Sequence, residues 1–302
     1  CLIDGDEDDV KWFLEKISKR FKCKEAEWLE PGAPLDYLGM EVSIDTDKIY
    51  MCMENYISNM VKMLDLEKAR KSNTPITVPV DASTRALTPV EKKRFMSALG
   101  CVGWLVNTTR PDVAYACSRI AQHMAQPTIS ALQAVEKMVC YLRDTADLAL
   151  AAPLWEADHT LCRDEFGNHL EPSDTDFWAY FCDSDFAGNS ETQNHRRSQN
   201  GYIALLNGAP VIWTSKVSSV AFAHPKIGEA HADVSSAAAE IYAAANATYD
   251  FFNISYVAEE AGLEVHLPII LQIDNAACEA FINHSADRTK LKHIDCRQEW
   301  VK

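Results

Sequence analysis

Three acidic residues at the ends of predicted elements are the best candidates in this sequence for catalytic chemistry. Asp183 ends an apolar run, FWAYFC, that predicts a strand, and Asp274 ends a second one, LPIILQI. Glu240 lies near the start of a long alanine-rich stretch that predicts a helix. Three carboxylates gathered at one edge repel one another unless divalent cations offset the charge. Oxygen ligands favour Mg²⁺ or Mn²⁺, and two such ions can activate a water and stabilise the leaving oxygen of a phosphodiester.

Each acid also has an ordinary structural explanation. Asp274 could cap the helix that follows it, and Glu240 alone could be a helix surface residue. Asp185 is expected to face solvent just past the strand end. The motif Asp183-Ser184-Asp185 also resembles the D-x-D of haloacid-dehalogenase phosphatases, but Phe186 follows it, and the next elements predict a hairpin rather than a crossover helix. The joint pattern therefore favours the metal site over the separate explanations.

The elements that must position these acids lie in the last part of the chain. Three strands are predicted from FWAYFCDS, GYIALL and PVIWTSK, and Asn207-Gly208 between the last two is a strong hairpin signal. A long helix then opens at Ser235 or Ser236 and ends at Gly262. The apolar run LPIILQIDN predicts a buried strand, which can pair parallel to the first one, and NAACEAFINH predicts a helix. The order β-β-β-α-β-α predicts an α/β fold with a mixed sheet.

The preceding residues divide by composition into helical, strand-forming and connecting segments. YLGMEVSID and KIYMCM predict a hairpin between two amphipathic helices, and TISALQAVEKMVCYLRDT predicts a helix opened by a Thr or Ser cap. The predicted organisation is an α+β region at 1–72, a proline-containing linker at 73–89, a small helical module at 90–150, an acidic and polar connector at 151–176, and the mixed-sheet domain at 177–302.

Composition restricts the class of protein. The chain has 302 residues, 47% of them apolar, and a net charge of −15, which argues against a broad electropositive DNA-binding surface. The segment from Ala86 to Arg143 is net positive, which indicates either a surface that tracks phosphates or ordinary solvated helix faces. Ten cysteines without a C-x-x-C pair, and no secretory or membrane-spanning pattern, indicate reduced thiols in a cytosolic or nuclear setting.

Several motifs together resemble the C-terminal part of a copia-type LTR retrotransposon Pol polyprotein. YLGMEV, ENYISNMVKML and NTPI are similar to the end of its reverse transcriptase region. SALGCVGWLVNTTRPDVAYACSRIAQHMAQPT and VCYLRDTADLAL resemble its connection to ribonuclease H. CDSDFAGN, GYIALLNGAPVIWTSK, SSAAAEIYA, IDNAAC and RTKLKHIDCR resemble the ribonuclease H domain. The resemblance covers nearly the whole chain in family order.

The resemblance implies a ribonuclease H-like fold and specific roles. It implies that Asp183, Glu240 and Asp274 are the catalytic and metal-binding carboxylates, holding two Mg²⁺ or Mn²⁺ ions. Family members often carry T-E-A-E where this chain has Ala237-Ala238-Ala239-Glu240. The polymerase aspartates are expected before Cys1 and a fourth ribonuclease H carboxylate after Lys302.

The resemblance also implies partners. They are an RNA–DNA hybrid and the rest of the Pol polyprotein, with no membrane and no small-molecule cofactor, in a virus-like particle when the element is intact. The expected contacts to nucleic acid are Arg110, Arg119, Lys290 and Lys292. Two alternatives stay open: a non-catalytic remnant or nucleic-acid-binding module, and a Mg²⁺-dependent phosphatase that uses the DSD motif.

Overall fold

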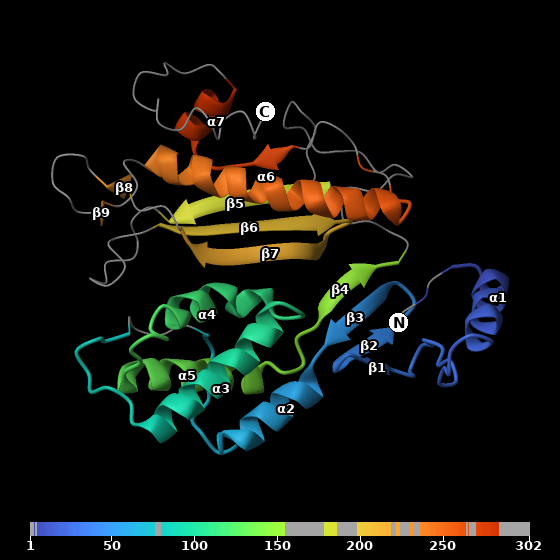
Figure 1. Cartoon of the computed structure of the whole chain (residues 1–302), viewed down its shortest axis with the longest axis horizontal. Helices are drawn as coiled ribbons and strands as arrows, with labels where there is room; N and C mark the ends of the chain where they lie inside the picture. Colours follow the sequence, from blue (N-terminus) through green and yellow to red (C-terminus); the bar gives the residue numbers. More distant parts are fainter. Residues whose placement is uncertain are drawn as a thin grey trace.

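The fold is mixed α/β, with two four-stranded sheets and a group of helices that lies beside the N-terminal sheet and below the C-terminal one in Figure 1. The computed structural model describes residues 3, 5–75, 80–154, 178–185, 198–218, 222–223, 230–231, 236–263, 265 and 270–283. Among these residues, no helix combines the length and the hydropathy that crossing a membrane requires.

The N-terminal sheet has the order β1-β2-β3-β4. The predicted hairpin is confirmed, because β2 pairs antiparallel with β3 and Asp45 accepts hydrogen bonds from the backbone N–H groups of Asp47 and Lys48 at the turn. The structure corrects the predicted connector at its start: residues 150–153 form β4, which pairs with β3. The elements are α1 (Glu7–Ser18), β1 (Leu35–Tyr37), β2 (Met40–Ile44), β3 (Lys48–Cys52), α2 (Glu54–Met63) and β4 (Leu150–Pro153).

The helical segment packs together with α2 around one apolar core. Its elements are α3 (Pro89–Val106), the 3₁₀ turn η1 (Pro111–Val113), α4 (Ala114–Ala121) and α5 (Ile129–Asp144). Thr88 and Glu91 form a capping box that starts α3. Thr128 is the N-cap residue of α5, but its hydroxyl bonds to the Asp81 carbonyl rather than capping the helix. Residues on both sides of the predicted 73–89 linker share this core, and the domain boundaries stay a prediction.

The C-terminal sheet has the order β10-β5-β6-β7. As predicted, the strand after the long helix lies beside the first strand and runs parallel to it. Asn207 and Gly208 both have positive φ, +52° and +86°, which is the geometry of a type I′ hairpin turn. The elements are β5 (Trp178–Asp185), β6 (Gln199–Leu206), β7 (Ala209–Val217), β8 (Phe222–Ala223), β9 (Ala230–His231), α6 (Ser236–Glu260), β10 (Leu271–Gln272) and α7 (Ala276–Ile282).

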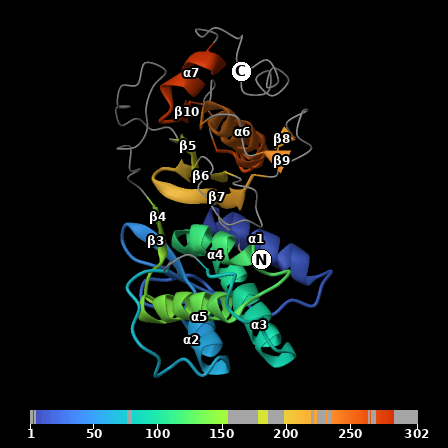
Figure 2. The same cartoon turned by 90° about the vertical axis from the view of Figure 1, so that its left-hand side faces the viewer.

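The two faces of this sheet have different neighbours. The long helix α6 covers one face (Figure 1). On this face the rings of Tyr180 and Tyr202 contact Phe251. At the β7 edge the sheet meets the helical segment (Figure 2). Trp213 Nε1 donates to the Val106 carbonyl at 2.6 Å there, and Gln199 Nε2 donates to Ser118 Oγ at 2.9 Å. These bonds hold the end of α3 and the middle of α4 beside the sheet.

Candidate metal centre

The structure brings the three sequence-predicted acids together. Asp183, Glu240 and Asp274 each offer one carboxylate oxygen, and these oxygens all lie within 4.8 Å of one another. Asp183 and Asp274 are exposed, whereas Glu240 is only 4% exposed. Asp185 lies two residues beyond Asp183 on the same strand and is exposed, and the cluster does not include it.

Strand register explains why Asp183 and Asp274 meet. Leu271 pairs with Tyr180 and Gln272 with Phe181 in the parallel β10–β5 ladder. Two residues further along, this register places Asp274 beside Asp183, at the spacing of neighbouring strands, which is about 4.8 Å. Backbone pairing at Leu271 and Gln272 therefore directs the following residues so that Asp274, two residues after the end of β10, comes close to Asp183.

Glu240 reaches the cluster from the second turn of α6. A helical side chain leans toward the helix N-terminus, which directs this carboxylate toward the end of β5. Burial, together with the charges of Asp183 and Asp274, raises the pKa of Glu240 to about 7, against the opposing effect of the hydrogen bond from the Ser184 backbone N–H. Glu240 Oε2 is buried without a hydrogen-bond partner among the described residues.

This donor set fits divalent cations. Three carboxylates within ligand distance carry up to three negative charges, and no described basic side chain forms an ion pair with them. A buried carboxylate oxygen without a partner costs free energy in the metal-free protein. Hard oxygen ligands of this kind suit Mg²⁺ or Mn²⁺, so the cluster has both the charge and the ligand type that such ions need.

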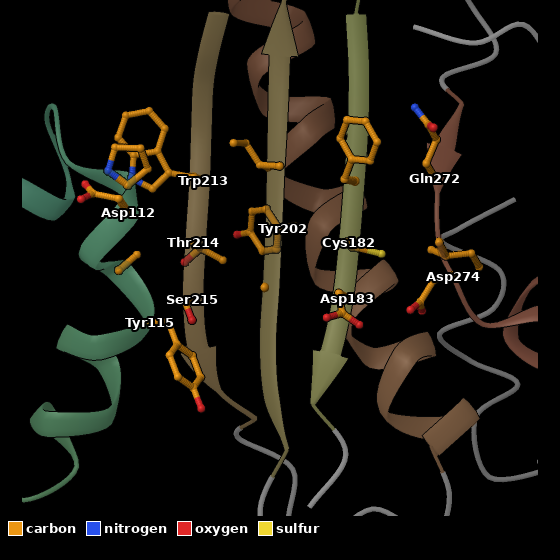
Figure 3. A pocket seen from close by; sticks show the side chains of 16 residues that line it. Asp112, Tyr115, Cys182, Asp183, Tyr202, Trp213, Thr214, Ser215, Gln272 and Asp274 are labelled. Carbon is orange, nitrogen blue, oxygen red and sulfur yellow. The ribbon is translucent and has the colours of Figure 1, made fainter. Parts of the chain in front are cut away.

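A groove leads away from the carboxylates across the face of the sheet opposite α6 (Figure 3). Its volume is about 580 Å³, and its lining includes Asp183, Asp274, Gly201, Trp213 and, from α4, Tyr115. The sequence interpretation did not single out Gly201 or Tyr115. Gly201 had a recognisable signal, because glycine inside a strand often marks a close approach of another molecule. Tyr115 had none, because its place beside the sheet depends on tertiary packing.

The predicted nucleic-acid contact at Arg110 is wrong. Its side chain is 2% exposed, and it donates from Nε and Nη2 to Asp112 and from Nη1 to the Thr145 carbonyl. Partial burial raises the pKa of Asp112, but the Arg110 guanidinium outweighs this effect and holds the pKa below its usual value. With its donors engaged inside the protein, Arg110 joins η1 to the end of α5 and is not placed to bind a phosphate.

Two further arginines of this segment are also engaged inside the protein. Arg94 pairs with Glu136, and Arg143 pairs with Asp144 and donates to the carbonyl groups of Leu66 and Ala69. These contacts favour the interpretation of solvated and loop-binding side chains over a surface that tracks phosphates. Arg119 is half-buried on α4. Lys290 and Lys292 lie outside the described residues.

Comparison with known proteins supports the resemblance seen in the motifs. The chain is 26% identical over 207 residues to "Retrovirus-related Pol polyprotein from transposon RE1" of Arabidopsis thaliana, covering 67% of this chain and 12% of that protein. It is 24% identical over 289 residues to the Pol polyprotein from transposon RE2 of the same plant, covering 94% and 17%. It is 24% identical over 295 residues to the Pol polyprotein from transposon TNT 1-94 of Nicotiana tabacum, covering 95% of this chain and 19% of that protein.

The chain spans less than a fifth of the length of these three relatives. No family model and no solved structure matches it. The matches nevertheless run over most of the chain and recur in separate transposons. The chain is therefore similar to a limited stretch of the retrovirus-related Pol polyproteins of transposons, which confirms the resemblance to copia-type elements.

Proposed function

We propose that the C-terminal part of this chain has a ribonuclease H-like fold and hydrolyses the RNA strand of an RNA–DNA hybrid, in the context of reverse transcription. The convergence of Asp183, Glu240 and Asp274 at one sheet edge carries this proposal. The strand order, with β10 parallel to β5 and α6 crossing between them, supports it, as does the relation to Pol polyproteins.

The three carboxylates would hold two Mg²⁺ or Mn²⁺ ions. When bound, such ions activate a water and stabilise the leaving oxygen of a phosphodiester. Asp183 and Asp274 are exposed and face the groove, so they are the ligands that lie nearest the substrate. Glu240 is buried behind them and completes the ligand set from the helix. Glu240 has a buried oxygen without a hydrogen-bond partner among the described residues, and its pKa is raised. A bound cation would therefore stabilise its charged form.

The decisive experiment is cleavage of an end-labelled RNA–DNA hybrid in the presence of Mg²⁺, with single-stranded RNA and duplex DNA of the same sequence as controls. Asp183→Asn is expected to abolish cleavage of the hybrid. Asp185→Asn is the matched control, because this exposed aspartate on the same strand lies outside the cluster. Unchanged cleavage by Asp183→Asn would show that the assignment is wrong.

The same preparations separate the two alternatives. A non-catalytic remnant would cleave no hybrid and would show no saturable Mn²⁺ binding that depends on Glu240. A phosphatase built on Asp183-Ser184-Asp185 would hydrolyse a small phosphate ester, leave the hybrid intact and lose activity in Asp185→Asn. The position of Asp185 outside the carboxylate cluster favours the nuclease.

A further inference from the structure

We propose that the hydrogen-bonded pair of Ser184 and Asn200 orients two of the three carboxylates for cation binding, with Ser184 as the positioning residue. This inference rests on the proposed function, because it concerns the ligands of the same candidate metal centre. The ligand atoms of the cluster are carboxylate oxygens of Asp183, Glu240 and Asp274. The pair therefore acts through these carboxylates and does not itself touch a cation or a substrate.

The backbone N–H of Ser184 faces two of the carboxylates. It donates to Asp183 Oδ1 at 2.7 Å, and it also bonds to the Glu240 carboxylate. A single donor between two acceptors fixes the orientation of each acceptor relative to the other. Carboxylates that hold a metal ion are commonly oriented by hydrogen bonds of this kind, and the loss of such a partner typically costs about 10–100-fold in metal affinity or activity.

The side chain of Ser184 makes a separate bond beneath α6. Alternation along β5 buries Cys182 and Ser184 on the face that α6 covers and leaves Asp183 exposed. There the Ser184 hydroxyl donates to Asn200 Oδ1 at 2.9 Å. Ser184 and Asn200 are directly paired across β5 and β6, which is the closest arrangement for cross-strand side chains. Ser184 thus connects a buried side-chain bond to the carboxylates at the end of β5.

The pair lies where β5 has the least support from neighbouring strands. Ser184 is the penultimate residue of β5, and β10 pairs with this strand only as far as Phe181. Beyond Phe181, β6 is the one strand among the described residues that pairs with β5. Figure 3 shows Asp183 close to the arrowhead of β5. Strand ends open more readily than strand centres, so a side-chain bond to Asn200 restricts the motion of the N–H that faces the carboxylates.

Asn200 is an unfavourable residue for the place that it occupies. It is 4% exposed and belongs to β6, which lies between β5 and β7, whereas asparagine is depleted from strands. Burial of an amide costs free energy unless hydrogen bonds compensate. Two apolar side chains of similar shape would hold β5 and β6 together about as well. The polar pair therefore departs from what stability favours, as is expected of residues that serve a functional site.

The test measures the Mn²⁺ affinity of the full chain at one pH near neutrality, by electron paramagnetic resonance of the free ion. Ser184→Ala and Asn200→Leu each break the bond, and leucine has nearly the shape of asparagine. We expect each change to weaken Mn²⁺ binding about tenfold or more. The double variant should bind no more weakly than the weaker of the two single variants, because both changes remove the same interaction.

The double variant also separates orientation of the carboxylates from stability of the fold. Each single change leaves one buried polar group without its partner, whereas the double variant has an apolar pair. Its thermal midpoint should therefore lie closer to that of the unchanged protein than the midpoint of either single variant does, while its Mn²⁺ affinity stays low. An affinity that recovers together with the thermal midpoint would overturn the proposal.

Two further variants serve as controls. Ser184→Thr keeps the hydroxyl, and threonine is favoured in strands, so its Mn²⁺ affinity should stay within about twofold of the unchanged protein. Ser255→Ala removes another buried hydroxyl, which donates to the Phe251 carbonyl within α6, and should leave the affinity unchanged. Equal weakening by Ser255→Ala and Ser184→Ala would show that any lost buried hydroxyl has this effect, which would also overturn the proposal.

Failure of this inference is distinguishable from failure of the proposed function. If the unchanged protein cleaves the hybrid and Ser184→Ala binds Mn²⁺ equally well, only the positioning role is wrong. If the unchanged protein binds Mn²⁺ but cleaves no hybrid, the comparison of affinities still decides the positioning role. If the unchanged protein shows no saturable Mn²⁺ binding, both the positioning role and the metal centre are wrong.

Discussion

Replacing Glu240 with glutamine should stabilise the metal-free protein at neutral and alkaline pH but not in acid. In the folded protein the pKa of Glu240 is raised to about 7 from its ordinary 4.5 by burial and by Asp183 and Asp274. Below about pH 4.5 the carboxyl group of Glu240 is protonated in both the folded and the unfolded chain, so it does not lower the free energy of unfolding. Between about pH 4.5 and 7 the unfolded chain loses its proton first, and the free energy of unfolding of the natural protein falls as pH rises.

The size of the effect follows from the shift. Each pKa unit corresponds to about 1.4 kcal/mol, so the full penalty above pH 7 is about 3 kcal/mol, and less where the unfolded chain keeps residual structure. The 4% exposure of Glu240 leaves little solvent to screen it. Urea unfolding followed by tryptophan fluorescence, in a chelator at about pH 4 and about pH 8, measures the difference between Glu240→Gln and the natural protein.

Glu259→Gln is the matched control, because it removes an exposed charge from the same helix. Addition of Mn²⁺ should then stabilise the natural protein, by about 2.7 kcal/mol at one hundred times the dissociation constant, and should stabilise Glu240→Gln much less. A stability difference between Glu240→Gln and the natural protein that is the same at both pH values would refute the electrostatic account of the cluster.

Three further predictions concern the helical segment. Arg110→Ala should lower the free energy of unfolding by about 3 kcal/mol, measured by urea titration, because it leaves Asp112 without its buried partner; a change below about 1 kcal/mol would contradict the structural role. Gly100→Ala should raise it by about 0.5–1 kcal/mol, since this exposed glycine lies inside α3 with nothing within 4 Å of an added Cβ. Thr88→Ala should cost about 1 kcal/mol by removing the capping box with Glu91, and an unchanged thermal midpoint would argue against that cap.

Local patterns determined most of the individual elements. Asn207-Gly208 specified the β6–β7 turn because few other residue pairs adopt two consecutive positive φ angles at low cost. The alanine-rich stretch predicted α6, and Gly262, at φ +82°, lies two residues after its end. The position of each acid near a strand or helix end could be recognised from sequence, because strand ends and helix starts depend on residues that are neighbours in the chain.

Only the tertiary structure determined which distant segments meet. Sequence alone could not show that residues 150–153 pair with β3. Nor could it show that the Arg110 side chain bonds to Asp112 and Thr145, or that Tyr115 lines the groove. These outcomes depend on side-chain packing and hydrogen bonds between residues far apart in the chain, whose energies no local pattern encodes. The sequence therefore determined the acids and the elements that carry them, and the folded packing determined what surrounds those acids.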